Sequence, residues 1–274
     1  MRKILLLTIL IFSTLSFKNK EVSWVAIGDS ITYLNDHSKE TNDRVSKGYM
    51  TLITEKLPYI KYINQGHNGW TAALIATNIE KLNLISADVY SVFLGTNDWW
   101  AGRPIGNIED YQNNTGNSTF YGSYKIIIDK LKVLNTNAKV ILITPLQRGD
   151  FVYFADFKNN AYGSYKPKKE QQLAQFAEAI IEIGKLENLE VIDLYNKSGI
   201  TLKNMVKFKR LKDPNTGEYK NYKYPDYIDV PFNPEKDEYP YPVEAIKMTY
   251  DGLHPSDKGN KIIAKMLVKQ MKKL

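Results

Sequence analysis

The sequence contains no cysteine among its 274 residues. A disulfide framework, a thiol nucleophile and a zinc site built on thiolates are therefore excluded. Histidine is nearly as scarce, because only His37, His67 and His254 are present, and this argues against a multi-histidine metal centre. We therefore expect no metal and no cofactor, and stability that comes from a packed core.

A hydrophobic run long enough to span a bilayer easily is also missing. The apolar stretch over residues 4–15 is too short, and it follows Arg2 and Lys3. This layout is typical of a secretory signal. We predict a signal peptide over residues 1–17 and export to the periplasm or the cell exterior, with no stable membrane span after cleavage. An uncleaved membrane anchor is the alternative.

The composition is that of a soluble globular protein, with 43% hydrophobic and 24% charged residues. The net charge is +7, but the lysines are scattered except in the last predicted helix. Apolar residues on the opposite side of that helix favour a solvated face over a surface that binds an acidic polymer or a membrane. We expect no nucleic-acid partner.

Short apolar runs alternate with stretches of helical periodicity along the chain. The predicted strands are residues 24–27, 59–63, 89–94, 140–143 and 191–194. The predicted helices between them are residues 49–57, 72–84, 124–134 and 171–186. This alternation predicts an α/β fold, a three-layer α/β/α sandwich around a mostly parallel five-stranded sheet, in one domain over residues 22–274.

Two segments interrupt the alternation. Residues 148–169 are rich in Phe, Tyr, Asn and Lys, and an insertion at about residues 203–243 carries six prolines and many tyrosines. Proline at this density disfavours a regular helix or a central strand. We predict ordered loops over one end of the sheet for both segments.

Four short motifs carry the candidate chemistry. They are Gly-Asp-Ser at 28–30, Asn-Gln-Gly-His-Asn-Gly at 64–69, Gly-Thr-Asn-Asp at 95–98 and Asp-Gly-Leu-His-Pro at 251–255. Each of the first three directly follows a predicted strand. Since ligands bind at the carboxyl ends of parallel strands, we expect these motifs to share one crevice.

The motifs supply the residues that a serine nucleophile needs for acyl transfer. Ser30 needs a base to take its proton, and His254 follows a carboxylate, Asp251, by three residues. Such a carboxylate fixes the histidine tautomer and leaves the second ring nitrogen for the serine. An oxyanion can be bound by the backbone N–H groups of Ser30 and Gly69 and by the side-chain amide of Asn97.

These four motifs, in this order, resemble those of the SGNH hydrolases, the GDSL esterase/lipase superfamily. The resemblance implies a flavodoxin-like sandwich and an acyl-ester hydrolase. It implies that Ser30, His254 and Asp251 form the catalytic triad, and that Ser30, Gly69 and Asn97 form the oxyanion hole. The Gly-x-Ser-x-Gly motif of α/β-hydrolases is absent, because Ile31 and Thr32 follow the serine.

Several other residues admit both a functional and a structural interpretation. Asp29 and Asp98 could form a glycosidase pair or bind a metal, but we predict that they accept hydrogen bonds from backbone amides in their turns. His67 could contact substrate or be hydrogen-bonded within its loop. His37 lies in a polar segment and is predicted to be exposed.

Four more residues are candidates for substrate binding. Trp99 and Trp100 follow Asn97 closely, and we expect at least one indole to line the crevice, where flat aromatic faces suit sugar rings. Arg103 and Arg148, in predicted loops at the same end, could bind an acidic group on the substrate.

These observations favour an exported serine esterase that removes acetyl or similar short acyl groups from a carbohydrate. A lipid-directed acyl hydrolase, such as a lysophospholipase or thioesterase, is the alternative, but the insertions lack a long aliphatic segment. A glycan-binding module without turnover is a third hypothesis, and the intact triad argues against it. The expected partner is a small acyl ester or an acylated glycan.

Overall fold

A central sheet of five strands organises the chain. The structure, a computed structural model, describes residues 20–274, so the predicted signal peptide lies outside the described residues. The strand order is β2-β1-β3-β4-β7, and every neighbouring pair is parallel. The strands are β1 (Val22–Gly28), β2 (Ile60–Gly66), β3 (Val89–Phe93), β4 (Lys139–Ile143) and β7 (Glu190–Ile192). The predicted five-stranded sheet is confirmed.

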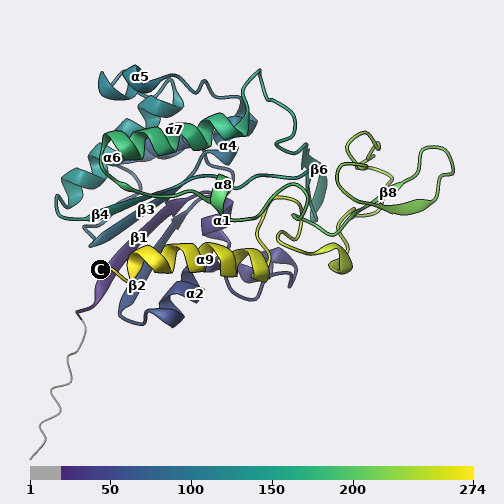
Figure 1. Cartoon of the computed structure of the whole chain (residues 1–274), viewed down its shortest axis with the longest axis horizontal. Helices are drawn as coiled ribbons and strands as arrows, with labels where there is room; N and C mark the ends of the chain where they lie inside the picture. The colour runs from purple at the N-terminus through teal and green to yellow at the C-terminus, as the bar shows by residue number, and fades with distance from the viewer. Residues whose placement is uncertain (1–19) are drawn as a thin grey trace, which may run out of the picture.

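Helices cover both faces of this sheet (Figure 1). On one face lie α2 (Tyr49–Lys56) and α9 (Asp257–Met271), and on the other lie α3 (Ala72–Asn78), α6 (Phe120–Leu134) and α7 (Leu173–Leu186). The shorter helices are α1 (Ser30–Tyr33), η1 (Ser38–Thr41), α4 (Thr96–Ala101), α5 (Ile108–Gln112), α8 (Leu194–Lys197) and η2 (Val243–Ala245).

Two hydrophobic clusters hold the three layers together. Successive residues of a strand point to opposite faces, so Trp24 of β1 packs in one cluster and Val25 in the other. The helical periodicity of α6 likewise gives it one buried and one exposed face, because Ile127 and Leu131 are buried while Val133 is 78% exposed. Burial on both faces explains why the central strands β1, β3 and β4 are rich in apolar residues.

No helix within residues 20–274 is both long and apolar enough to cross a membrane.

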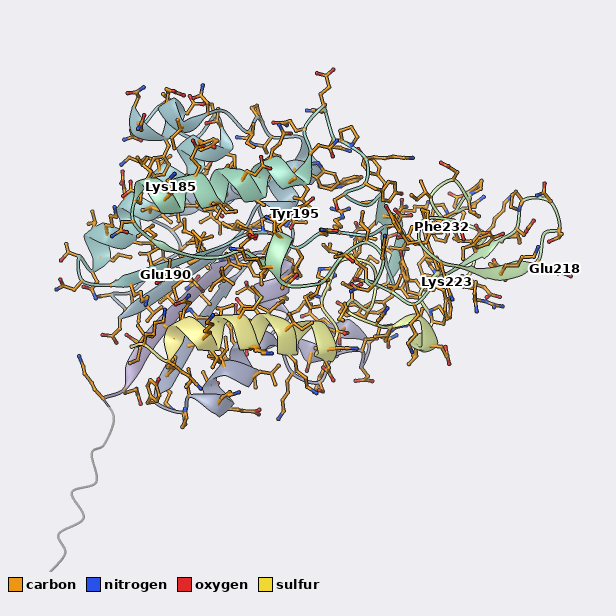
Figure 2. All side chains as sticks on the ribbon, viewed as in Figure 1. Lys185, Glu190, Tyr195, Glu218, Lys223 and Phe232 are labelled. Carbon is orange, nitrogen blue, oxygen red and sulfur yellow. The ribbon has the colours of Figure 1, made fainter. Side chains whose placement is uncertain are left out.

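The two segments predicted to be loops each contain an antiparallel hairpin. The first pairs β5 (Phe151–Tyr153) with β6 (Asp156–Ala161), and the second pairs β8 (Lys209–Lys212) with β9 (Tyr219–Tyr222). The loop prediction was wrong here, because Pro214 lies in the β8–β9 turn and Pro225 follows β9, so neither interrupts a strand. The second hairpin projects away from the sheet (Figure 1), and Glu218 and Lys223 mark this arm in Figure 2.

A buried ion pair ties the two segments to each other. The Lys209 Nζ atom lies 2.7 Å from the Asp150 carboxylate, and both side chains are at most 10% exposed. The same carboxylate accepts hydrogen bonds from the Gly163 backbone N–H and the Tyr165 hydroxyl. The Tyr241 hydroxyl donates to the Asp150 carbonyl oxygen, so the insertion is held at both of its ends.

Removing the cation of this pair should therefore destabilise the protein strongly. We expect Lys209→Met to lower the free energy of unfolding by about 3–5 kcal/mol, because it leaves the Asp150 charge buried without its counter-ion. Lys158→Met is the matched control, since Lys158 pairs with Glu235 between the same two segments but both side chains are more than 60% exposed. Its cost should stay below about 1 kcal/mol in urea unfolding. Equal effects of the two variants would contradict the assignment.

Candidate active site

The candidate residues meet at one edge of the sheet. Gly28, the last residue of β1, pairs with Gly66 of β2 on one side and with Phe93 of β3 on the other. The three motifs that follow these strands therefore begin side by side. Together with the loop before α9 they line a pocket of about 440 Å³, whose wall includes Ser30, Gly69, Asn97 and His254.

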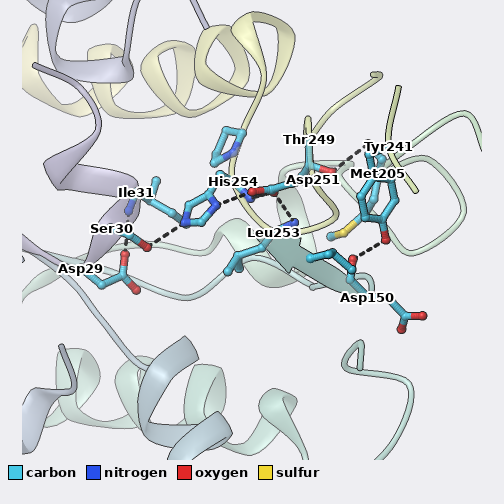
Figure 3. A network of polar contacts seen from close by, with 12 residues as sticks. Asp29, Ser30, Ile31, Asp150, Met205, Tyr241, Thr249, Asp251, Leu253 and His254 are labelled. Atoms are coloured by element: carbon cyan, nitrogen blue, oxygen red, sulfur yellow. Dashed lines mark hydrogen bonds and ion pairs between the residues drawn. The ribbon is translucent and has the colours of Figure 1, made fainter. Parts of the chain in front are cut away.

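Ser30 is the first residue of α1, directly after the carboxyl end of β1. Asp29 caps this short helix, and its carboxylate accepts a hydrogen bond from the Ile31 backbone N–H at 3.0 Å. This cap fixes the backbone between β1 and α1, which directs Ser30 toward the pocket. The Ser30 Oγ atom lies 2.8 Å from the His254 Nε2 atom (Figure 3).

One carboxylate fixes both the histidine ring and its loop. The Asp251 Oδ2 atom lies 2.7 Å from His254 Nδ1. Its Oδ1 atom accepts hydrogen bonds from the backbone N–H groups of Leu253 at 3.0 Å and His254 at 2.7 Å (Figure 3). This arrangement favours the tautomer with a proton on Nδ1, so that Nε2 can accept the Ser30 proton.

Aromatic rings enclose the histidine on two sides. The Tyr250 ring is stacked near the His254 ring with 5.7 Å between centroids, and the Phe151 ring meets it edge-on at 5.5 Å. Phe151 belongs to β5, and Tyr153, Asn159 and Ala161 of the same hairpin also line the pocket. We did not single out these residues from the sequence, although the aromatic content of residues 148–169 was the available signal.

The candidate oxyanion donors lie on neighbouring loops. Gly69 has a φ of +72°, in the left-handed region, and a Cβ built there would meet no atom of the described chain within 4 Å. Backbone conformation, rather than crowding within the protein, thus favours glycine here. The Asn97 Nδ2 atom donates to the Trp70 carbonyl oxygen at 3.1 Å, which orients the amide, and the amide carries a second N–H.

Asp29 and Asp98 both accept hydrogen bonds from backbone amides, as predicted, but the partner of Asp98 lies outside its own turn. Both Asp98 carboxylate oxygens accept from the Ala72 backbone N–H, at 2.9 and 3.0 Å, at the start of α3. Burial raises the pKa of Asp98 to about 7 and that of Asp29 to about 6. No cluster of three or more metal-ligating side chains occurs within residues 20–274.

Two of the predicted substrate contacts line the pocket and three do not. Trp100 and Arg148 are pocket residues. Trp99 is fully buried and donates from Nε1 to the Gln171 carbonyl oxygen, so its assignment was wrong. Adjacent residues of a helix point about 100° apart, so α4 can direct only one of the two indoles outward.

Arg103, which was predicted to bind the substrate, and His67, for which substrate contact was one of two interpretations, also lie outside the pocket lining. The Arg103 guanidinium donates to the Asn117 carbonyl oxygen at 3.0 Å and so holds a neighbouring loop. The His67 ring stacks on Trp70 at 4.2 Å between centroids, and burial lowers its pKa. His37, predicted to be exposed, is half-buried because its ring stacks on Tyr33.

A known protein family matches most of this chain. Residues 26–262 match the GDSL-like Lipase/Acylhydrolase family. The chain belongs to this family. A search of curated proteins gave no match.

Solved structures of the family have the same fold. A possible lipase from Chitinophaga pinensis is 62% identical, with a TM-score of 0.91 over 92% of this chain and 98% of that one. A lipase/acylhydrolase from Enterococcus faecalis is 19% identical, with a TM-score of 0.51 over 92% and 96%. An acetylxylan esterase from Geobacillus stearothermophilus is 14% identical, with a TM-score of 0.50 over 92% and 94%. The acylhydrolase is thus an ester-cleaving enzyme of the SGNH fold.

Gly252 sets the position of the loop that carries Asp251 and His254. Its φ is +89°, and a Cβ there would lie 1.7 Å from the Asp150 carbonyl oxygen. The Gly149 backbone N–H donates to the Gly252 carbonyl oxygen at 2.8 Å, so the two segments are in direct contact.

We therefore expect Gly252→Ala to displace the histidine loop and to lower kcat/KM for a nitrophenyl ester by roughly 10²-fold or more, because small misplacements of reacting groups cost this much. Gly199→Ala is the matched control, since Gly199 has a similar φ of +73° and its Cβ would meet nothing within 4 Å. The control should lose some thermal stability but keep its kcat/KM. Similar activity in both variants would show that the contact with Asp150 does not position the histidine.

Proposed function

We propose that this acylhydrolase is an exported serine esterase that removes acetyl or similar short acyl groups from a carbohydrate. The observation that carries the proposal is a pair of linked hydrogen bonds at the wall of a 440 Å³ pocket. Asp251 bonds His254 at 2.7 Å, and His254 bonds Ser30 at 2.8 Å. Export is supported by the signal-like sequence of residues 1–17.

In the proposed mechanism, the Ser30 oxygen attacks the ester carbonyl carbon while His254 Nε2 takes the serine proton. The resulting oxyanion accepts hydrogen bonds from the Ser30 and Gly69 N–H groups and the Asn97 amide. When the C–O bond to the alcohol breaks, His254 returns the proton to the leaving oxygen. Water, activated by the same ring, then cleaves the acyl–serine bond and releases the acid and free Ser30.

The pocket lining supports a sugar-like alcohol group. Aromatic rings of Trp100, Tyr153 and Tyr250 lie in its wall beside the polar side chains of Asn68 and Asn159. Indoles and phenols combine apolar faces with polar tips and so suit the surfaces of sugar rings. A protein of the same fold is an acetylxylan esterase, so the fold accommodates this type of substrate.

A lipid-directed acyl hydrolase is the second candidate. The relative that is 62% identical is described as a possible lipase, and Leu34, Phe151 and Leu253 give the pocket some apolar surface. Acyl-chain length separates the two candidates.

We expect nitrophenyl acetate to be cleaved with a kcat/KM at least about tenfold higher than nitrophenyl palmitate, since a short acyl group leaves room for the alcohol group in the pocket. Ser30→Ala should lower kcat for acetate by roughly 10³-fold or more. Preference for palmitate would favour the lipid-directed enzyme, and turnover that survives in Ser30→Ala would exclude the serine mechanism.

Replacement of Asn97 should affect the transition state more than substrate binding. We expect Asn97→Ala to lower kcat by roughly 10²–10³-fold and to change KM by less than about threefold, because the contact strengthens as the oxyanion forms. Steady-state kinetics with nitrophenyl acetate test this, and far-UV circular dichroism checks the fold. A rise in KM alone would mean that Asn97 only binds the substrate.

A further inference from the structure

Arg148 is a buried cation in the wall of the pocket. It follows β4 by five residues, is only 2% exposed, and lines the same pocket as Ser30 and His254. Its backbone is fixed, because its N–H donates to the Ser164 hydroxyl at 3.1 Å and its carbonyl oxygen accepts from the Ser164 N–H at 2.7 Å. The guanidinium carbon lies 4.7 Å from the centroid of the Trp100 ring.

The charge of Arg148 is not matched by a direct partner. Its Nε atom is buried without a hydrogen-bond acceptor, and the ion pairs within residues 20–274 do not include it. The carboxylates that act on it from further away, Asp150 and Asp251, are engaged with Lys209 and His254. Burial lowers the pKa of Arg148 to about 10, so the group is still a cation at neutral pH.

Such an arrangement is unfavourable by itself. A buried charge without a counter-ion destabilises the fold, and the indole face offsets only part of this cost. A ligand anion that entered the pocket would supply the missing partner. The guanidinium is planar and donates through several N–H groups, which suits a carboxylate that accepts two parallel hydrogen bonds.

The charge of the pocket favours a monoanion. Apart from the histidine ring, the charged side chains in its wall are Arg148 and Glu40. A carboxylate would neutralise the single cation, whereas a dianionic phosphate would leave a second negative charge in a pocket that already contains Glu40.

We propose that Arg148 binds a carboxylate on the substrate, so that the preferred substrates are acyl esters of acidic sugars such as acetylated uronic acids. This proposal rests on the proposed esterase function of Ser30 and extends it by naming the substrate class. The residue binds the substrate away from the reacting carbonyl and takes no part in bond cleavage.

The test compares acetate release from acetylated methyl glucuronoside and from acetylated methyl glucoside, which differ in the carboxylate. We expect the wild-type enzyme to prefer the acidic sugar by roughly 10- to 100-fold in kcat/KM, the range for a hydrogen bond to a charged group. In Arg148→Gln the ratio of kcat/KM for the acidic sugar to kcat/KM for the neutral sugar should fall to about one, because the charged donor is gone.

Lys168→Gln is the matched control. The Lys168 Nζ atom lies 3.8 Å from the centroid of the same Trp100 ring, but Lys168 does not line the pocket. Its removal changes the net charge by the same amount as Arg148→Gln and should leave the preference within about threefold of wild type. An equal loss of preference in both variants would show a general field effect and overturn the specific contact.

A second measurement needs no substitution of Arg148. Free methyl glucuronoside should inhibit wild-type hydrolysis of nitrophenyl acetate at a concentration at least about tenfold lower than methyl glucoside. Equal inhibition, or a wild-type ratio of one for the two acetylated sugars, would overturn the proposal while leaving the esterase intact. Absence of Ser30-dependent hydrolysis of any ester would instead contradict the proposed function.

A carboxylate on the acyl group is the other source of the same chemistry. Nitrophenyl hydrogen succinate and nitrophenyl butyrate form the corresponding pair. A preference for succinate that depends on Arg148, without a preference between the sugars, would overturn the acidic sugar and place the carboxylate on the acyl side. No Arg148-dependent preference in either pair would overturn carboxylate binding altogether.

Discussion

Four of the pocket residues of this acylhydrolase depend on one constraint, which is that all five strands of the central sheet run in the same direction. Parallel strands place their carboxyl ends at one edge, so the loops that follow them must share that edge. Ser30, Gly69, Asn97 and Arg148 follow β1, β2, β3 and β4 in this way. A candidate nucleophile, two candidate oxyanion donors and a cation from four distant parts of the sequence therefore line one pocket.

The histidine loop reaches the same edge by a different route, and Asp150 is the residue that supports it. The Asp150 backbone leaves no room for a Cβ at Gly252, while its carboxylate holds Lys209 and Tyr165. The insertion at 203–243 thus contacts the segment beside the triad without lining the pocket itself. Its contribution is mechanical support, and the β5–β6 hairpin is the segment that shapes the pocket.

The sequence was sufficient for the sheet and for the placement of the candidate residues beside it, because both produce strong local patterns. Strands buried on both faces are rich in apolar residues, and three of the four motifs directly follow predicted strands. Both hairpins escaped prediction because their strands are short, and in the β8–β9 hairpin the prolines lie in the turn, at Pro214, and beyond the strands, at Pro225. Here the number of prolines in the segment was less informative than their positions.

The direction in which each side chain points was the second feature that the sequence did not predict. Trp99 and Trp100 are indistinguishable by residue type, and only the rotation of α4 against the core decides that Trp99 is buried. Arg103 and Arg148 present the same problem, because one binds a loop carbonyl while the other lines the pocket. Such outcomes depend on contacts between segments distant in sequence, such as Trp99 with Gln171, which no local pattern encodes.

In the proposed reaction, different residues of the pocket bind the substrate and stabilise the transition state. A carboxylate held by Arg148 has the same charge before and during the reaction, so this contact stabilises the bound substrate and the transition state equally. In the proposed mechanism, by contrast, the negative charge on the reacting oxygen exists only after attack, and the amides proposed to act on that charge are those of Gly69 and Asn97. Because the Asp251 carboxylate is already engaged by His254 and two backbone N–H groups, it can hold the histidine without competing for Arg148. The buried cation can therefore select the substrate while the chemistry at Ser30 stays that of a general acylhydrolase.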